Sequence, residues 1–346
     1  MKKNTHLIMF LCLLGFYSCK KNHDRVASPQ VVDVYVAGSD GNYATYWKNG
    51  NAVNLGINGV ANSITVSDSD VYVAVTVADP QGTTSAIYYK NGVPIILTSG
   101  FGANSITVSG NDVYVAGWDD GITGQTPMVA KYWKNGIGIN LTNGSYPAAA
   151  TSIIVSGNDV YVAGYEDDVH GYQFATYWKN GIPVTLPNDS VLNFANSIAV
   201  SGNNIYVAGS LGSFFIDRPG PRIAKYWKNS NLVNLTDSSE RGFASSIAVS
   251  GNDVYIAGSV APPSLGGRIV PVYWKNGSAV YLTNDSNNIF SYANSIAVSG
   301  NDVYVAGNSI DTTARTIVKY WKNDNAVNLT TISSNAVANS IFVSVH

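Results

Sequence analysis

Two short stretches, SIAVSGNDVYIAG at residues 246–258 and YWKNG at residues 273–277, determine the fold of this chain. Both recur along it. The second stretch has seven copies, whose middle aromatic residues are 42 to 49 positions apart: Trp47, Tyr89, Trp133, Trp178, Trp227, Trp274 and Trp321. The serine that opens the first stretch recurs as Ser63, Ser105, Ser152, Ser197, Ser246, Ser295 and Ser340. A period of this length indicates a repeat architecture with one structural unit per copy.

Each unit contains four short strand-like runs. In the sixth unit we predict strands at 246–250, 253–258, 270–275 and 279–283. The first and second runs are joined by Gly251-Asn252, and the third and fourth by Asn276-Gly277. Glycine and asparagine tolerate the positive φ that two-residue hairpin turns require. Four antiparallel strands per unit are typical of a β-propeller blade.

The two ends of the repeat predict how the ring closes. The first unit begins at its second strand, at 31–38, and the chain stops after an isolated first strand at 338–345. If the last strand joins the first unit, every sheet is complete and no edge strand is left exposed. We therefore predict an all-β fold: a seven-bladed β-propeller of four-stranded blades over residues 31–346, closed by the C-terminal strand in the first blade.

The repeating phrases resemble known bacterial propeller repeats. Residues 31–346 are similar to repeats of the SBBP type and, more distantly, to NHL repeats, in which an IAV…GNVYVAG-like hairpin precedes a strand ending in lysine and an aromatic residue. The resemblance implies a propeller lipoprotein of a Bacteroidota-like cell envelope. It implies little about activity.

The N-terminus reads as an export signal. Lys2 and Lys3 precede an apolar run at 7–17 that is too short to span a membrane as a helix, and Ser18-Cys19 follows. We predict a lipoprotein signal peptide at 1–18, acylation of Cys19 and a polar tether at 19–30, with the lipid anchored in the outer membrane. The alternative is an ordinary secretory signal with an incidental cysteine. Without Cys12, which lies in the apolar run, Cys19 has no disulfide partner.

Charge argues against a nucleic-acid partner. Only 12% of the residues are charged, and from residue 31 onward there are 15 basic and 21 acidic residues. Nucleic-acid binding requires a concentrated basic surface, which such a body lacks.

Candidate binding residues lie in the longer connections. The short hairpin turns fall on one side of each blade, so the variable connections share the opposite side, where propellers usually carry function. We predict ligand-binding residues in the loops between the second and third strands: Trp118, Asp119, Asp120, Tyr165, Glu166, Asp167, Asp168, His170, Arg218, Arg222 and Arg268. Aromatic side chains flanked by polar groups suit a sugar or an extended peptide. The alternative is that these are solvated loop residues whose aromatic side chains pack on neighbouring blades.

Metal and catalytic motifs are weak. Glu166, Asp167 and Asp168 offer oxygen ligands for calcium, but no EF-hand-like loop surrounds them. Zinc is disfavoured, because His170 and His346 are the only histidines after residue 30. Asp120 and Glu166 are the one carboxylate pair that we consider for glycoside hydrolysis. We predict no resident metal, no cofactor and no catalytic residue.

The residues repeated in every unit favour structural roles. We expect the aromatic set to pack between blades and the serines to bond to backbone at the channel. We also expect each lysine that follows the aromatic residue to run its alkyl stem over that residue and to point its ammonium group to water: Lys48, Lys90, Lys134, Lys179, Lys228, Lys275 and Lys322. A lysine ring that binds anionic polymer or lipid headgroups is the alternative.

Together these features predict a monomeric, non-enzymatic envelope protein that binds a glycan, a peptide or a protein partner. An enzyme acting on extracellular polysaccharide and a structural docking platform are the two alternatives.

Overall fold

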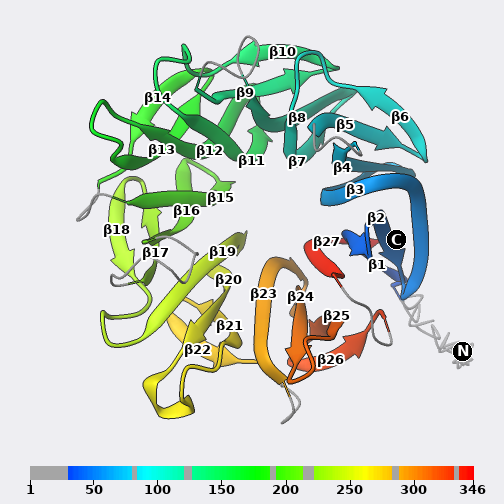
Figure 1. Ribbon diagram of the computed structural model, residues 1–346, viewed down its shortest axis with the longest axis vertical. Coiled ribbons are helices and arrows are strands. Elements are labelled where there is room, and N and C mark those ends of the chain that lie inside the picture. Colours follow the sequence, from blue (N-terminus) through cyan, green and yellow to red (C-terminus); the bar gives the residue numbers. More distant parts are fainter. Residues whose placement is uncertain are drawn as a thin grey trace, which may run out of the picture. The chain divides into compact units, whose positions relative to one another are not determined.

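The chain divides into Met1–Val31 and Val32–His346. The computed structural model describes residues 30–79, 84–120, 127–187, 192–212, 222–282, 288–330 and 335–346. The predicted signal peptide, Cys19 and Arg218 lie outside these ranges. Within Val32–His346 the sheets are arranged around a central opening, and the first strand of each repeat lies innermost (Figure 1).

Five of the sheets have four strands each, ordered as in the sequence from the inside outward. The first comprises β7 (Gly102–Ser109), β8 (Asp112–Asp119), β9 (Val129–Lys134) and β10 (Ile137–Asn140). The second comprises β11 (Ala148–Ser156), β12 (Asp159–Asp167), β13 (Gln173–Lys179) and β14 (Ile182–Thr185). The third comprises β15 (Asn193–Ser201), β16 (Asn204–Leu211), β17 (Ile223–Lys228) and β18 (Asn231–Asn234). The fourth comprises β19 (Arg241–Ser250), β20 (Asp253–Ala261), β21 (Val270–Lys275) and β22 (Ser278–Tyr281). The fifth comprises β23 (Asn288–Ser299), β24 (Asp302–Asp311), β25 (Thr316–Lys322) and β26 (Asn325–Asn328).

The remaining strands form one sheet of seven, in the order β27-β1-β2-β3-β4-β5-β6. Its members are β1 (Val32–Asp40), β2 (Tyr43–Lys48), β3 (Asn51–Ser67), β4 (Asp70–Ala78), β5 (Thr84–Lys90), β6 (Val93–Ile96) and β27 (Val337–Val345). The first half of β3 pairs with β2 and its second half pairs with β4. Positive φ angles at Gly56 and Gly59 let the strand bend without a loop. The sequence predicts two separate sheets here, and the structure joins them through this curved strand (Figure 1).

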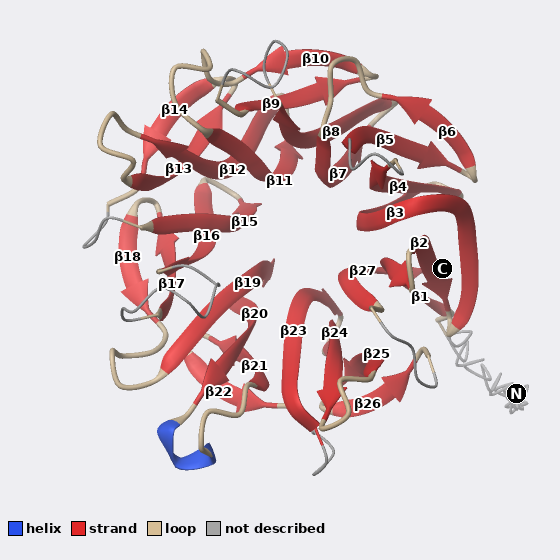
Figure 2. Ribbon diagram, viewed as in Figure 1, coloured by secondary structure: helices blue, strands red, loops and turns tan. Residues whose placement is uncertain are grey.

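The C-terminal strand closes the arrangement. β27 pairs antiparallel with β1, from Val32 opposite Val345 to Ser39 opposite Val337. The prediction that the last strand completes the first unit is confirmed. Figure 2 shows strands throughout; the one helix in the described part of the chain is the 3₁₀ turn η1 (Pro263–Leu265) between β20 and β21.

The predicted hairpins are confirmed in the sixth unit. Gly251 has a φ of 58°, and Asn276 and Gly277 have φ angles of 51° and 84°. These turns fix the register, with Ser250 opposite Asp253 and Lys275 opposite Ser278.

The hydrophobic core lies between neighbouring sheets. In one of its clusters Tyr206 and Ala224, from the third four-stranded sheet, contact Ile247 and Trp274 from the fourth. All six tryptophans of the repeat are at most 1% exposed, and Tyr89 takes the same place with 4%. The predicted packing role of this aromatic set is confirmed.

A ring of hydrogen bonds joins the inner strands. The hydroxyl oxygen of each repeating serine accepts a backbone N–H from the next inner strand, as between Ser246 and Ile296 at 3.3 Å. Seven such bonds are present, and the bond from Ile64 to Ser340 joins the last strand to the first part of the chain. This confirms the predicted role of the serines.

A β-bulge precedes each of these serines, as at Asn196, where the register passes from Ala195 to Ser197. A bulged residue has no partner in its own sheet. Asn196 instead donates from Nδ2 to the carbonyl oxygen of Ala244 in the next sheet, at 2.8 Å. In six of the seven inner strands the bulged residue in this way links its own strand to the next inner strand.

Candidate functional site

The fold separates two faces. The two-residue turns form the short-turn face. The connections from second to third strands, and from fourth strands to the next first strand, form the long-loop face. Each repeat contributes residues to both faces, so the turns or connections that line a candidate site decide on which face it lies.

A cluster of four side chains recurs on the short-turn face. In the fourth four-stranded sheet Lys275 Nζ lies 2.9 Å from Asp253 Oδ2, and Asn276 donates to Asp253 Oδ1 at 2.8 Å. Tyr255 donates its hydroxyl to the same carboxylate at 3.3 Å, and Lys275 lies 5.2 Å from the centre of its ring. The hydrogen bonds from Asn276 and Lys275 lower the pKa of Asp253. The lysine was expected over the aromatic residue that precedes it, but the ring that it lies over is that of Tyr255 in the second strand.

The lysine side chains are about half exposed, as Lys275 is at 46%, and six of the seven lysines also form ion pairs. The pairs are Lys48–Asp33, Lys90–Asp70, Lys134–Asp112, Lys179–Asp159, Lys275–Asp253 and Lys322–Asp302. Asn204 stands at the aspartate position beside Lys228. Most of the positive charge on the short-turn face is therefore already paired.

Two predicted aromatic residues of the long-loop face pack on neighbours. Trp118 stacks on Phe101 with ring centres 6.0 Å apart, and Tyr165 meets Phe194 edge-on at 5.6 Å. Both predicted residues are half-buried. Tyr165 thus packs on the neighbouring sheet, as the alternative interpretation expects, whereas Trp118 packs on the residue that precedes β7 of its own sheet.

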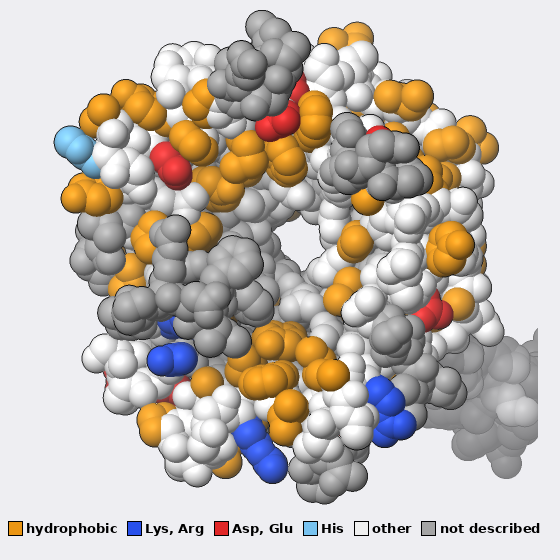
Figure 3. Space-filling view, viewed as in Figure 1, with side chains coloured by type: hydrophobic (Ala, Val, Ile, Leu, Met, Phe, Trp, Pro, Cys, Tyr) orange, Lys and Arg blue, Asp and Glu red, His pale blue; other side chains and the backbone are white. Residues whose placement is uncertain are grey.

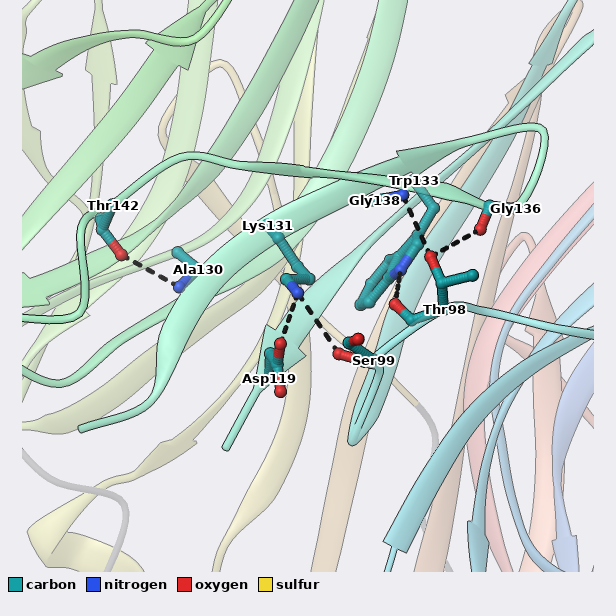
Figure 4. A network of polar contacts seen from close by, with 9 residues as sticks. All are labelled: Thr98, Ser99, Asp119, Ala130, Lys131, Trp133, Gly136, Gly138 and Thr142. Carbon is teal, nitrogen blue, oxygen red and sulfur yellow. Dashed lines mark hydrogen bonds and ion pairs between the residues drawn. The ribbon is translucent and has the colours of Figure 1, made fainter. Parts of the chain in front are cut away.

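Asp119 belongs to a buried ion pair. Its Oδ2 lies 2.5 Å from Lys131 Nζ, and the two side chains are 13% and 6% exposed. Lys131 also donates to the carbonyl oxygen of Ser99 at 3.3 Å, and the neighbouring Trp133 donates from Nε1 to Thr98 at 2.8 Å (Figure 4). The ion pair therefore joins strands β8 and β9, and Lys131 links them to the loop before β7.

The acidic residues predicted as calcium ligands do not all point one way. Glu166 and Asp167 are consecutive in β12, where side chains alternate between the faces of the sheet. Asp168 Oδ1 accepts N–H bonds from His170 at 2.8 Å and Tyr172 at 2.9 Å, which shapes the loop. Burial raises the pKa of both Glu166 and Asp167. Among the described residues, no group of three or more histidine, cysteine or acidic side chains is placed to hold a metal ion.

A cavity of about 390 Å³ lies on the long-loop face between the third, fourth and fifth four-stranded sheets. Its described lining consists of Arg222, Ser239, Arg241, Phe243, Ser259, Val260, Ala261, Pro263, Gly267, Ile269 and Phe290. Figure 3 shows hydrophobic side chains gathered in this region, beside the central opening, with basic side chains near them. No acidic residue is among these lining residues.

The strands fix the position of the cavity walls. Arg241 and Phe243 lie near the start of β19, opposite Ala261 and Ser259 of β20. Gly242, between them, donates its N–H to the carbonyl oxygen of Arg222 at 2.8 Å, which ties β19 to the residue before β17. Because alternate residues of a strand share a face, Arg241 and Phe243 point the same way.

Charge is concentrated in this cavity. The Arg222 guanidinium lies 5.6 Å from the centre of the Phe243 ring, and Arg222 is only 7% exposed. Burial, together with the neighbouring charge of Arg241, lowers the pKa of Arg222. The site therefore combines two guanidinium groups with an aromatic wall.

Two of the predicted binding residues lie at this cavity. Arg222 lines it, and the exposed Arg268 lies between the lining residues Gly267 and Ile269. Arg241, Phe243 and Phe290 were missed, because the prediction considered only loops between second and third strands. Phe243 stands three residues before Ser246, a position that is aromatic in two other repeats (Phe194 and Tyr292) and small or aliphatic in the rest. An aromatic residue here is therefore not specific to this repeat, and the sequence offers no signal that singles out Phe243.

A second, more open cavity of about 560 Å³ lies on the seven-stranded sheet and is lined by small, polar and amide residues such as Asn42, Asn58 and Asn335. Its described lining carries no charged side chain. The first cavity is the more specific candidate.

Comparison with known proteins supports the fold. The model of the LVIVD repeat matches residues 102–123, 194–216, 241–260 and 291–311, and each match covers first and second strands of a sheet. No curated protein matches the chain in sequence. The β-propeller domain of the Trilobed protease from Pyrococcus furiosus has 10% identity and a TM-score of 0.54, with 87% of this chain and 92% of that chain covered.

Two further solved structures are similar at lower TM-scores. They are apo AztD from Citrobacter koseri (14% identity, TM-score 0.41) and a putative TolB from Agrobacterium tumefaciens (12% identity, TM-score 0.47). Each alignment covers 92% of this chain and 99% of the other. No helix in the described residues is long and apolar enough to span a membrane. The repeat match and the solved propeller domain together show that the chain is a β-propeller repeat protein.

Proposed function

We propose that this chain is a seven-bladed propeller that binds a glycan, a peptide or a protein partner through its long-loop face, without catalysing a reaction. The strand pairing supports the blade count, since β3 serves as the outer strand beside β2 and as the inner strand beside β4. The seven serine hydrogen bonds around the ring agree with seven inner strands.

The cavity that contains Arg222, Arg241 and Phe243 carries this proposal. It is concave, it has an apolar wall and it contains a few polar groups, which are the properties of small ligand sites. On the opposite face six of the seven repeating lysines are paired with aspartates. The long-loop face therefore offers the better binding surface.

We also propose that the protein is exported and held in the outer membrane of a Bacteroidota-like envelope by acylated Cys19. Metabolic labelling with a palmitate analogue tests this anchor, with Cys19→Ala as the matched variant. Label on the native chain and none on the variant is expected. Equal labelling of both would contradict the anchor.

Thermal unfolding of the full chain with a panel of oligosaccharides, peptides and calcium tests the binding function. A ligand at about 100 times its dissociation constant stabilises the folded state by about 2.7 kcal/mol. We expect a shift with at least one ligand, loss of that shift in Phe290→Ala, and retention of it in Lys228→Ala on the short-turn face. A shift that Lys228→Ala removes and Phe290→Ala preserves would contradict the assignment to the long-loop face.

A further inference from the structure

The cavity on the long-loop face has a chemistry that defines its ligand more narrowly. Arg222 lies just before β17 and Arg241 opens β19, so the two guanidinium groups come from adjacent sheets. Both line the same cavity. Arginine presents parallel N–H donors that match the two oxygens of a carboxylate. Two arginines from two sheets thus line one cavity, where both can donate to one anionic group.

Much of the remaining described lining is apolar. Phe243, Val260, Ile269 and Phe290 line the cavity beside the arginines. Its volume of about 390 Å³ falls within the range of small-ligand pockets. An anion with an apolar or aromatic body satisfies both parts of the site at once.

The polar lining favours a peptide over a neutral sugar. Apart from the arginines, the hydrogen-bonding side chains among the described lining residues are those of Ser239 and Ser259. A sugar presents several hydroxyl groups that need paired acceptors when they are buried. A peptide that ends in an apolar residue needs donors at its carboxylate and an apolar pocket for its side chain.

We propose that this cavity binds the C-terminal carboxylate of a peptide that ends in an apolar or aromatic residue, with Arg222 and Arg241 holding the carboxylate. The inference rests on the proposed binding function and specifies its ligand. A bound carboxylate also offsets the repulsion between the two guanidinium groups, which adds to burial in lowering the pKa of Arg222.

Calorimetric titration of the full chain with N-acetyl-Gly-Gly-Phe tests this inference. The same peptide with an amidated C-terminus is the matched ligand. The free acid is expected to bind at least about tenfold more tightly, because hydrogen bonds to a charged group are worth more than those to an amide. N-acetylphenylalanine, which has the same ring and carboxylate, is expected to bind more weakly than the peptide.

Variants of the protein locate the contact. Arg241→Ala should weaken binding of the free-acid peptide by at least about tenfold and leave the affinity for the amidated peptide unchanged. Arg241 is exposed, so this variant keeps the core intact. Arg222→Lys serves as a second variant that preserves charge. Arg315→Ala is the control, because this arginine pairs with Asp311 at 2.8 Å and is not part of the cavity lining.

Equal affinity for the free-acid and amidated peptides, or for N-acetylphenylalanine and the peptide, would overturn the inference. So would tighter binding of an oligogalacturonate, which represents an acidic glycan in the same titration, or no binding of any peptide. The proposed binding function has its own readout in the panel of ligands. A ligand whose stabilisation depends on Phe290 would keep that function even where the carboxylate inference fails.

Discussion

Substitution of Gly258 by alanine should destabilise the protein strongly, because this glycine lies opposite a bulge in β19. A Cβ atom at Gly258 would lie 1.9 Å from the carbonyl oxygen of Phe243 and 2.8 Å from Cζ3 of Trp274. Neither neighbour is the free end of a flexible chain: one is backbone and the other is a buried ring. Overpacking of this kind costs about 1–3 kcal/mol or more, and each strand hydrogen bond lost adds about 1 kcal/mol. We expect a loss of about 3 kcal/mol or more.

Gly251→Ala is the matched control in the same hairpin. Nothing lies within 4 Å of a Cβ atom there, although its φ of 58° is positive. The left-handed backbone alone costs alanine about 1 kcal/mol. Urea denaturation of both variants and the native chain measures the difference. Equal destabilisation by the two substitutions would refute the close-approach argument.

The chain itself contains a compensated version of the Gly258 contact. At the equivalent positions in β4 and β5 it has Val75 in place of the glycine and Tyr89 in place of the tryptophan. The smaller ring leaves room for the added side chain. The double variant Gly258→Ala/Trp274→Tyr should therefore lose about 1 kcal/mol less stability than the two single variants lose in sum. Strict additivity would show that the ring is not the limiting contact.

Three further predictions concern closure, the buried ion pair and pH. Ser340→Ala should lower the free energy of unfolding by about 1 kcal/mol, the same as Ser197→Ala, because each serine accepts one N–H in a continuous ring. Urea denaturation measures both losses. A much smaller loss for Ser340→Ala would indicate that the ring is weak at its closing strand. Asp119→Ala should lower the free energy of unfolding by about 3–5 kcal/mol, because it leaves Lys131 buried without its carboxylate partner, and adding Lys131→Met should recover most of this loss. Unchanged stability in Asp119→Ala would contradict the structural role of this carboxylate and favour a role in ligand binding. The pKa of Asp253 is lowered from its ordinary 3.8 by Asn276 and Lys275, so its stabilisation is present above pH 3.8 and is lost as pH falls through the lower folded value. The acid limb of a plot of unfolding midpoint against pH should flatten in Asp253→Asn, and an unchanged acid limb would contradict this.

Local patterns in the sequence predicted most of the fold. Asn276-Gly277 identified a hairpin, and the isolated strand at the C-terminus identified closure, because both follow from short-range geometry and from the need to pair strand edges. The strands themselves extend further than predicted. β19 begins at Arg241 instead of residue 246, since the bulge before Ser246 lets pairing continue past the irregular position.

The candidate site was less predictable, because it depends on packing between sheets. Trp118 and Asp119 have the residue types of a binding site, but Phe101 and Lys131 engage them. Arg222 was named as a candidate from its loop. Its relation to Phe243 arises from two sheets meeting in space, and one sequence without the structure does not encode that distance in any local pattern.

Hydrogen–deuterium exchange with a bound ligand tests the central claim, that the cavity on the long-loop face is the binding surface. The ligand is one that raises the unfolding temperature of the full chain, and the Arg315→Ala variant serves as the reference. The account predicts slower exchange at 239–243 and 259–269, around the cavity, and no change in the turns at 251–252 and 276–277. Protection confined to the turns of the short-turn face would contradict it.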